Sequence, residues 1–230
     1  MFIRVNFREG ILTQVVTSWS GGKDSCLALA MARESGMKVT HLLNILNEDG
    51  RTSCTHGLSS DLMQAQDRSM GIPLIQLVTN GFRYEADFKK CLKELHKQGV
   101  EGGIFGNGDV ERQWIDSVCR EVGIAAHLPL EGMTKDRILR EFISRGFEAI
   151  IVTTRADVMG EEWLGRKLDA AFLRDWDEIR REKKISRAAE AGAYHTTVLG
   201  GPAFKKNLEI VESNKVLQDG FWYLNILKVE

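Results

Sequence analysis

The segment WSGGKDSC near the N-terminus gathers residue types that bind phosphate. Gly21 and Gly22 leave no Cβ in the way of an approaching phosphate oxygen, and Lys23 supplies a positive charge. Ser20 and Ser25 can donate hydroxyl hydrogen bonds. A β-branched run precedes the segment and a helical pattern follows it, so backbone N–H groups and the positive end of a helix would face the same anion. The segment therefore predicts a phosphate-binding loop.

Asp24 stands at the centre of this segment, where a carboxylate would repel a bare phosphate. One interpretation places Mg²⁺ between Asp24 and the phosphates. The other makes Asp24 a first-turn acid that stabilises the helix by about 0.3–1 kcal/mol through the helix dipole, and both can hold.

Two familiar nucleotide-binding loops are excluded by the spacing of the glycines. The nucleoside-triphosphatase loop needs GxxxxGK followed by Ser or Thr, and the dinucleotide pattern GxGxxG fails at GNGDVE, which ends in Glu111.

The elements that would position the loop alternate regularly between residues 11 and 154. Short β-branched runs are followed by longer helical patterns, with glycine or proline between them. This predicts an α/β fold with a doubly wound parallel sheet, in which FEAIIVTT is the last strand. Ligands bind beyond the carboxyl ends of such strands, so the loop at Ser20, the turn at 47–56 and the loop at 106–109 should converge on one crevice.

The pattern changes after residue 154. A charged, helix-prone segment precedes three strand-like runs, TTVLGGPAF, NLEIVES and FWYLNILKVE, and Asp219 and Gly220 form a turn signal before the last run. We therefore expect a nucleotide-binding α/β domain over residues 1–154. Residues 155–230 should form a smaller C-terminal α+β lobe on the substrate side. The apolar strand FWYLNIL could pair with a second subunit to form a homodimer.

Composition limits the partners and the location of the protein. The chain has 230 residues, of which 43% are hydrophobic, and a formal net charge of -1. Nucleic acid is therefore not expected as a partner, because no overall positive charge attracts it. No apolar run is long enough to cross a membrane, and MFIRVNFREG lacks the apolar core of a secretion signal, so a cytoplasmic protein is expected. The cysteines include no CxxC pair, and Cys26 is expected to pack in the interior.

The string SGGKDS after a first strand is similar to the PP-loop of the N-type ATP pyrophosphatases. This superfamily includes GMP synthetase, asparagine synthetase and tRNA-thiolating enzymes. The resemblance implies ATP and Mg²⁺ as cofactors, and cleavage between the α and β phosphates of ATP. A substrate oxygen would attack the α phosphorus, pyrophosphate would leave into the loop, and a nucleophile would then displace AMP. Lys23 and Asp24 would be catalytic, with Asp24 on the metal ion.

A narrower resemblance covers nearly the whole chain. Five blocks resemble the diphthine–ammonia ligase family in order: THGLSSDLMQAQDRSMGIPL, IFGNGDVERQWIDSVCREVGI, LPLEGMTKDRILREFISRGFEAIIV, EEWLGRKLD and EAGAYHTTVLGGPAF. In that family ammonia is added to the carboxyl of diphthine, a modified histidine of translation elongation factor 2. The resemblance implies an AMP-forming ligase that adenylates a carbonyl or carboxyl oxygen and adds ammonia to it. The acceptor would be a protein such as elongation factor 2, or a small molecule.

Further candidate site residues lie in three segments outside the loop. They are His56; Gly106 and Asp109; and Glu190, Tyr194, His195 and Thr196. The resemblance implies that His56, Tyr194 and Thr196 bind the acceptor and that Glu190 and His195 are catalytic. Gly106 and Asp109 would bind the nucleotide. Without the resemblance, His56 is equally a helix cap or surface residue, Asp109 is equally the N-cap of the following helix, and residues 189–196 form a polar loop.

Three departures from the family pattern keep two rivals open. Ala193 stands where the family has glutamate, Glu131 follows LPL in place of tryptophan, and FGNGDV replaces FGDI. One rival is a PP-loop enzyme acting on another acceptor such as tRNA, and the lack of CxxC pairs counts against it. The other is an ATP-binding or AMP-binding module with little turnover, which Ala193 supports.

Overall fold

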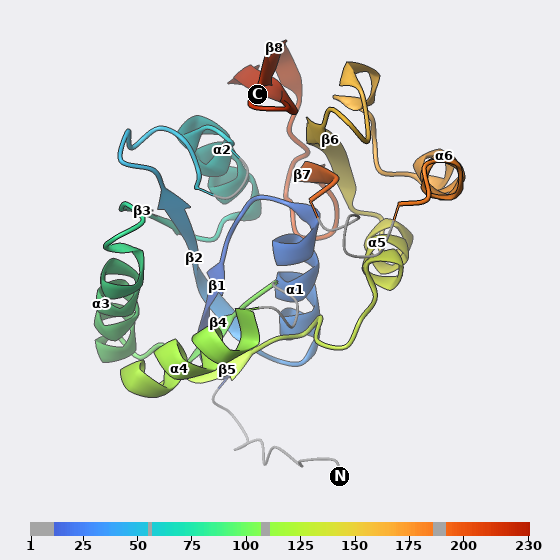
Figure 1. The fold of residues 1–230 in the computed structure, drawn as a ribbon. Helices are drawn as coiled ribbons and strands as arrows, with labels where there is room; N and C mark the ends of the chain where they lie inside the picture. Colours follow the sequence, from blue (N-terminus) through green and yellow to red (C-terminus); the bar gives the residue numbers. More distant parts are fainter. Residues whose placement is uncertain (1–11, 55–56, 107–110, 186–191) are drawn as a thin grey trace.

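The computed structural model describes residues 12–54, 57–106, 111–185 and 192–230. Its first sheet has five parallel strands in the order β3-β2-β1-β4-β5 (Figure 1). The strands are β1 (Gln14–Ser18), β2 (Lys38–Leu46), β3 (Leu74–Val78), β4 (Gly102–Ile104) and β5 (Ala125–His127). The strand order reverses between β1 and β4, the place where doubly wound sheets bind ligands. The predicted α/β fold with a parallel sheet is confirmed.

Helices cover both faces of this sheet. They are α1 (Lys23–Glu34), α2 (Ser60–Met70), α3 (Tyr84–Lys97), α4 (Arg112–Val122) and α5 (Lys135–Ser144). The neighbouring residues Val15 and Val16 of β1 point to opposite faces, and they belong to different hydrophobic clusters. Helices α1, α2 and α5 contribute to the cluster of Val15, whereas α3 and α4 contribute to that of Val16. Two apolar layers therefore hold the sheet between helices.

A second sheet is antiparallel and has the strand order β7-β6-β9-β8. Its strands are β6 (Glu148–Arg155), β7 (Tyr194–Gly200), β8 (Ile210–Gln218) and β9 (Phe221–Val229). The short 3-10 helix η2 (Glu161–Trp163) and helix α6 (Ala170–Glu182) lie between β6 and β7 in the chain. The predicted turn before the last strand is confirmed, since Asp219 and Gly220 both have positive φ, 50° and 80°.

The prediction that FEAIIVTT is the last strand of the parallel sheet is wrong. This segment forms β6, which pairs antiparallel with β7 and β9. An apolar run of this length suits a buried strand of either kind of sheet, so periodicity alone did not distinguish them. The second sheet thus begins at Glu148, whereas the domain division at residue 154 stays a prediction. The strand FWYLNIL is β9, which lies inside the sheet, and the edge strands are β7 and β8.

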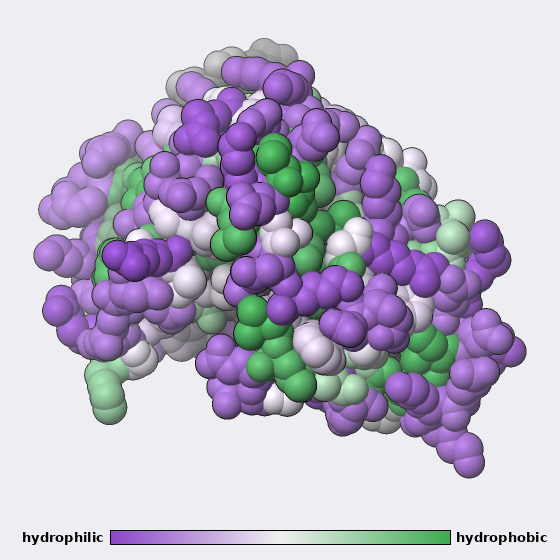
Figure 2. Space-filling model, turned by 90° about the horizontal axis from the view of Figure 1, so that it is seen from above, coloured by the Kyte–Doolittle hydropathy of each residue, from purple (hydrophilic) through white to green (hydrophobic). Residues whose placement is uncertain are grey.

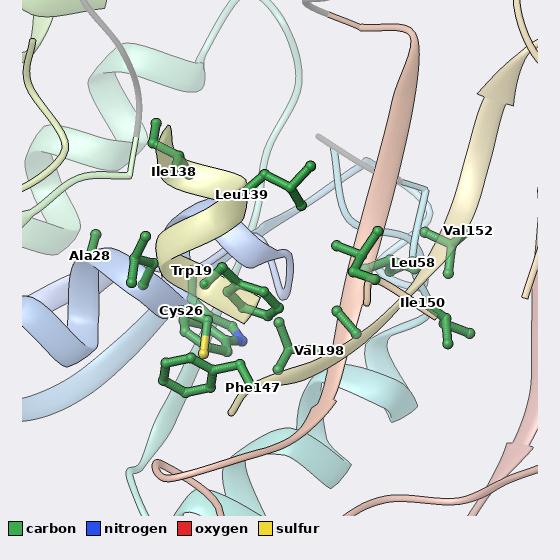
Figure 3. Packing of buried hydrophobic residues seen from close by; sticks show 14 of the residues in the cluster. Trp19, Cys26, Ala28, Leu58, Ile138, Leu139, Phe147, Ile150, Val152 and Val198 are labelled. Carbon is green, nitrogen blue, oxygen red and sulfur yellow. The ribbon is translucent and has the colours of Figure 1, made fainter. Parts of the chain in front are cut away.

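One hydrophobic cluster joins the two sheets. Trp19, which follows β1, and Cys26 of α1 pack in the same cluster as Phe147 and Val198 (Figure 3). Cys26 is completely buried, and burial raises the pKa of its thiol well above the ordinary value, which confirms its packing role. The two sheets therefore share a core, and a site at their junction has a fixed geometry.

The surface in Figure 2 shows hydrophobic groups separated by hydrophilic ones on the face seen from above. No helix within the described ranges has an apolar stretch long enough to cross a membrane.

Candidate functional site

The loop between β1 and α1 lies where the strand order of the parallel sheet reverses. Gly21 has φ +75°, and a Cβ at this position would collide with the side chain of Met63. Gly106, which follows β4, lies against the first turn of α1, since a Cβ there would be 2.7 Å from the backbone nitrogen of Ser25. Glycine at Gly106 thus lets the end of β4 contact the loop directly.

The end of β2 and the turn that follows it lie on the other side of the loop. The Asn44 side chain donates to the carbonyl oxygen of Trp19 at 2.9 Å and to the Ser53 hydroxyl at 3.2 Å. The predicted convergence of the three segments is therefore found for their described parts. His56, Asp109 and Glu190 lie outside the described residues.

Gln66 of α2 ties the loop to β7. Its side chain is fully buried, and its Oε1 accepts from the indole N–H of Trp19 at 2.8 Å. Its amide nitrogen donates to the carbonyl oxygens of Gly21 at 3.1 Å and Val198 at 2.8 Å, and contacts the Thr197 hydroxyl at 3.3 Å. The Trp19 indole N–H and the Gly21 carbonyl oxygen thereby have hydrogen-bond partners, and the backbone of Gly21 is held in place.

Strand β7 also supports the start of α1. The backbone N–H of Val198 donates to the carbonyl oxygen of Gly21 at 2.9 Å. Gly22, at the N-cap of α1, has no side chain to cap the helix, and the Thr196 hydroxyl instead accepts from the Lys23 backbone N–H at 3.1 Å. This contact places Thr196 beside the loop, and acceptor binding by Thr196 stays a prediction.

Three charged side chains meet at the start of α1. The Lys23 ammonium lies 3.1 Å from the Asp24 carboxylate, and the Lys135 ammonium lies 3.9 Å from the same carboxylate oxygen. The exposed fractions of the three side chains are 13% for Lys23, 28% for Asp24 and 44% for Lys135. Two positive charges thus face one negative charge next to the phosphate-binding loop. This grouping of charges would favour an anion beside the loop, even though the whole chain has a formal net charge of only -1.

Burial and the charges of Lys23 and Asp24 together shift the pKa of His195 on β7. Burial lowers the pKa of the imidazole below its ordinary value, the positive charge of Lys23 lowers it further, and the carboxylate of Asp24 opposes the shift. A lowered pKa keeps the ring neutral near pH 7, where a neutral imidazole can accept a proton.

Tyr194 precedes His195 and lies between the loop and α6. Its ring packs edge-on against Phe172 and Trp176, with centroids 5.4 Å apart in both pairs, and the Lys23 ammonium lies 5.7 Å from its centre. Ala193 is fully buried. The position where the resemblance leads us to expect glutamate therefore brings only a methyl group to this part of the molecule.

The residues present suit a nucleotide with its metal ion better than a metal centre made by the protein. No three acidic, histidine or cysteine side chains gather as a metal site in the part of the chain that the structure describes. Mg²⁺ commonly takes one or two carboxylates and completes its shell with water and substrate phosphates, so Asp24 alone fits that role.

Two residues of the site were missed by the sequence analysis. Gln66 lies on the buried face of a helix, where a polar side chain indicates that it makes hydrogen bonds. Its partners could not be inferred from the sequence, because one of them is Val198 on a strand far along the chain. Lys135 follows the N-cap Thr134, an ordinary place for a surface charge. Nothing local to either segment indicates that it meets the loop.

Comparisons with known proteins match almost the whole described chain. The model of the diphthamide synthase N-terminal domain matches residues 13–126, and that of the diphthamide synthase C-terminal domain matches residues 134–230. A diphthine–ammonia ligase of Rattus norvegicus is 26% identical over 225 residues, which are 86% of this chain and 83% of that protein. One of Danio rerio is 26% identical and covers 89% of each chain.

A relative from Schizosaccharomyces pombe, also a diphthine–ammonia ligase, is 22% identical over 86% of this chain. The chain spans only 36% of that longer protein. Among solved structures, a predicted subunit of a tRNA methyltransferase from Methanocaldococcus jannaschii is 17% identical, with a TM-score of 0.44 over 82% of this chain and 98% of that one.

Proposed function

The chain belongs to the diphthine–ammonia ligase family of the PP-loop superfamily, whose curated members are AMP-forming ligases that use ATP, and we propose that it amidates an acceptor by the same chemistry. An acceptor oxygen attacks the α phosphorus of ATP, and the bond to the leaving pyrophosphate breaks. Ammonia then attacks the activated carbon, and AMP leaves with the acceptor oxygen. The observation that carries this proposal is the loop Ser20–Gly22, held by β7 beside Lys23 and Asp24.

In this proposal the loop and the start of α1 bind the phosphates. The hydroxyls of Ser20 and Ser25 lie 3.2 Å apart, next to the glycines, so both can turn toward one ligand. Lys23 neutralises charge that develops on the leaving pyrophosphate. Mg²⁺ on Asp24 would supply further charge neutralisation when it is bound.

His195 is proposed to accept the proton that the attacking ammonia must lose. When the C–N bond forms and the C–O bond to AMP breaks, the nitrogen carries one proton too many. A neutral imidazole can take it, and the pKa of His195 is shifted in the direction that keeps it neutral. Tyr194 borders the same place, so we propose that the acceptor approaches along the start of β7. Glu190 stays a candidate for the same work.

The acceptor is proposed to be a carboxyl group on a protein, as the diphthine in the names of the relatives indicates for those enzymes. A small-molecule carboxylate and a tRNA base are the alternatives, and a net charge of -1 disfavours tRNA. A cytoplasmic location belongs to the same proposal, supported by four cysteines that are all free thiols. A homodimer stays a prediction.

The test is incubation with ATP, Mg²⁺ and ammonia, with and without each candidate acceptor. The proposal expects AMP and pyrophosphate to appear in equal amounts, together with an amidated acceptor. Binding of ATP in a calorimeter without any AMP formation would instead favour the nucleotide-binding module, for which Ala193 is the sequence argument. Amidation of a tRNA alone would favour the other rival.

A further inference from the structure

Lys135 stands at the first position of α5, and its ammonium is the second cation on Asp24. The residue comes from a helix that follows the parallel sheet, about 110 residues after the loop in the chain. Its side chain is 44% exposed, so Lys135 contacts Asp24 and is also accessible to a ligand.

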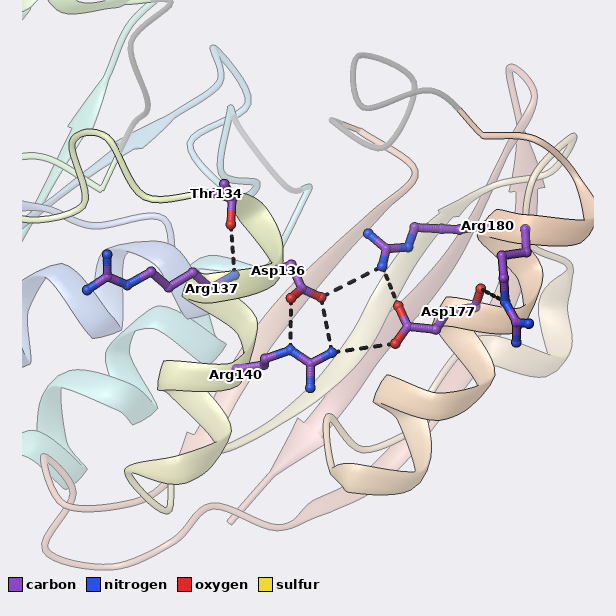
Figure 4. A network of polar contacts seen from close by, with 7 residues as sticks. Thr134, Asp136, Arg137, Arg140, Asp177 and Arg180 are labelled. Atoms are coloured by element: carbon purple, nitrogen blue, oxygen red, sulfur yellow. Dashed lines mark hydrogen bonds and ion pairs between the residues drawn. The ribbon is translucent and has the colours of Figure 1, made fainter.

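The backbone that carries Lys135 is fixed on three sides. The Thr134 side chain caps α5 by accepting from the backbone N–H of Arg137 at 3.2 Å. Asp136 pairs with Arg140 at 2.8 Å and with Arg180 of α6 at 3.7 Å, as Figure 4 shows. On the opposite side, apolar residues of α5 pack against α1 in the cluster of Figure 3. The starts of α1 and α5 are thus held next to each other.

Two cations meet one carboxylate at this junction, among the ion pairs of the residues that the structure describes. Lys23 and Lys135 contribute two positive charges and Asp24 contributes one negative charge. If Asp24 held Mg²⁺, the ammonium groups of Lys23 and Lys135 would share its carboxylate with a further cation, and both would favour another anion nearby. A polyphosphate oxygen is the partner that the adjoining loop would bring to them.

We propose that Lys135 is a second catalytic lysine, which moves from Asp24 to the leaving pyrophosphate. This inference rests on the proposed function, and it names a residue that binds the pyrophosphate leaving group of that reaction. When the acceptor oxygen forms its bond to the α phosphorus, the electron pair of the breaking P–O bond passes to the pyrophosphate oxygen. The ammonium of Lys135 neutralises that oxygen, and no proton has to move in the step.

The first experiment is equilibrium binding by calorimetry with Mg²⁺ present, using inorganic pyrophosphate and AMP as separate probes. Lys135→Met should weaken pyrophosphate binding by about tenfold, the size of one charge-assisted hydrogen bond, and leave AMP binding unchanged. Lys135→Arg should keep most of the affinity. Lys93→Met, which removes an exposed lysine from α3 on the other face of the sheet, is the matched control and should change neither constant.

A second experiment measures ATP turnover in the same variants. Lys135→Met should lower kcat by more than it raises the KM for ATP, because the charge on pyrophosphate is largest in the transition state. Equal weakening of pyrophosphate and AMP, or weakening of neither, would overturn the role of Lys135. The binding experiment needs no turnover, so a wild-type protein that binds pyrophosphate but never forms AMP would contradict the proposed function and leave Lys135 as a pyrophosphate ligand.

Discussion

Replacing Gln66 with methionine should loosen the phosphate-binding loop without leaving a cavity. The two side chains are similar in length, so the loss is chiefly that of hydrogen bonds. The indole N–H of Trp19 and the carbonyl oxygen of Val198 would lose the partner that Gln66 provides, whereas Gly21 keeps the bond from the Val198 N–H. At about 1–3 kcal/mol for each of these two buried groups left unsatisfied, we expect a loss of about 2–6 kcal/mol in unfolding free energy.

The same change should raise the Kd for ATP, because the backbone of Gly21 is no longer held by α2. Urea unfolding measures the first effect and calorimetry with ATP the second. Gln64→Met is the matched control on the same helix, since Gln64 is only partly buried and bonds to Ser60 and Gln76 away from the loop. We expect it to cost less than about 1 kcal/mol. The reasoning is refuted if Gln66→Met is as stable as the wild type, or if both variants lose ATP affinity equally.

Three further predictions concern Lys23, Asp24 and His195, which are titratable residues of the site. Lys23→Ala should abolish AMP formation and leave the protein folded, with cooperative urea unfolding, as measured by product chromatography and urea unfolding; AMP release at the wild-type rate would rule out the loop assignment. Asp24→Asn should weaken the Mg²⁺ dependence of turnover more than the thermal stability of the fold, and equal losses would support the helix-dipole interpretation. The lowered pKa of His195 predicts that stability falls as pH drops below about 6.5, because the unfolded chain then binds a proton that the folded chain disfavours. His41 and His127 share this direction, so His195→Gln should make the pH dependence of the urea midpoint shallower without removing it, and an unchanged slope would contradict the assignment.

Local sequence patterns were enough to predict the loop and the parallel sheet with its helices. The residue types in SGGKDS, the preceding apolar strand and the following helix are all neighbours in the chain, and each depends on short-range geometry. The alternation of strand and helix then leads to a parallel sheet, because parallel strands need such crossovers. Site residues near the loop were therefore accessible to sequence reasoning.

Pairing between distant segments was not accessible in the same way. The strand β6 was assigned to the wrong sheet, because its apolar pattern does not specify a partner and its partners β7 and β9 come later in the chain. The role of Thr196 as the group that caps α1 is equally non-local, since it joins residues 173 positions apart.

The sequence by itself determined that a loop of glycine, serine and lysine lies between a strand and a helix, and which residue types this loop offers to the proposed nucleotide. The tertiary structure decided what holds that loop and what charge surrounds it. Gln66 reaches it from α2, Thr196 from β7 and Lys135 from α5. Such contacts depend on how packed elements are oriented, and a hydrogen bond or ion pair acts only over a few ångströms whatever the distance along the chain.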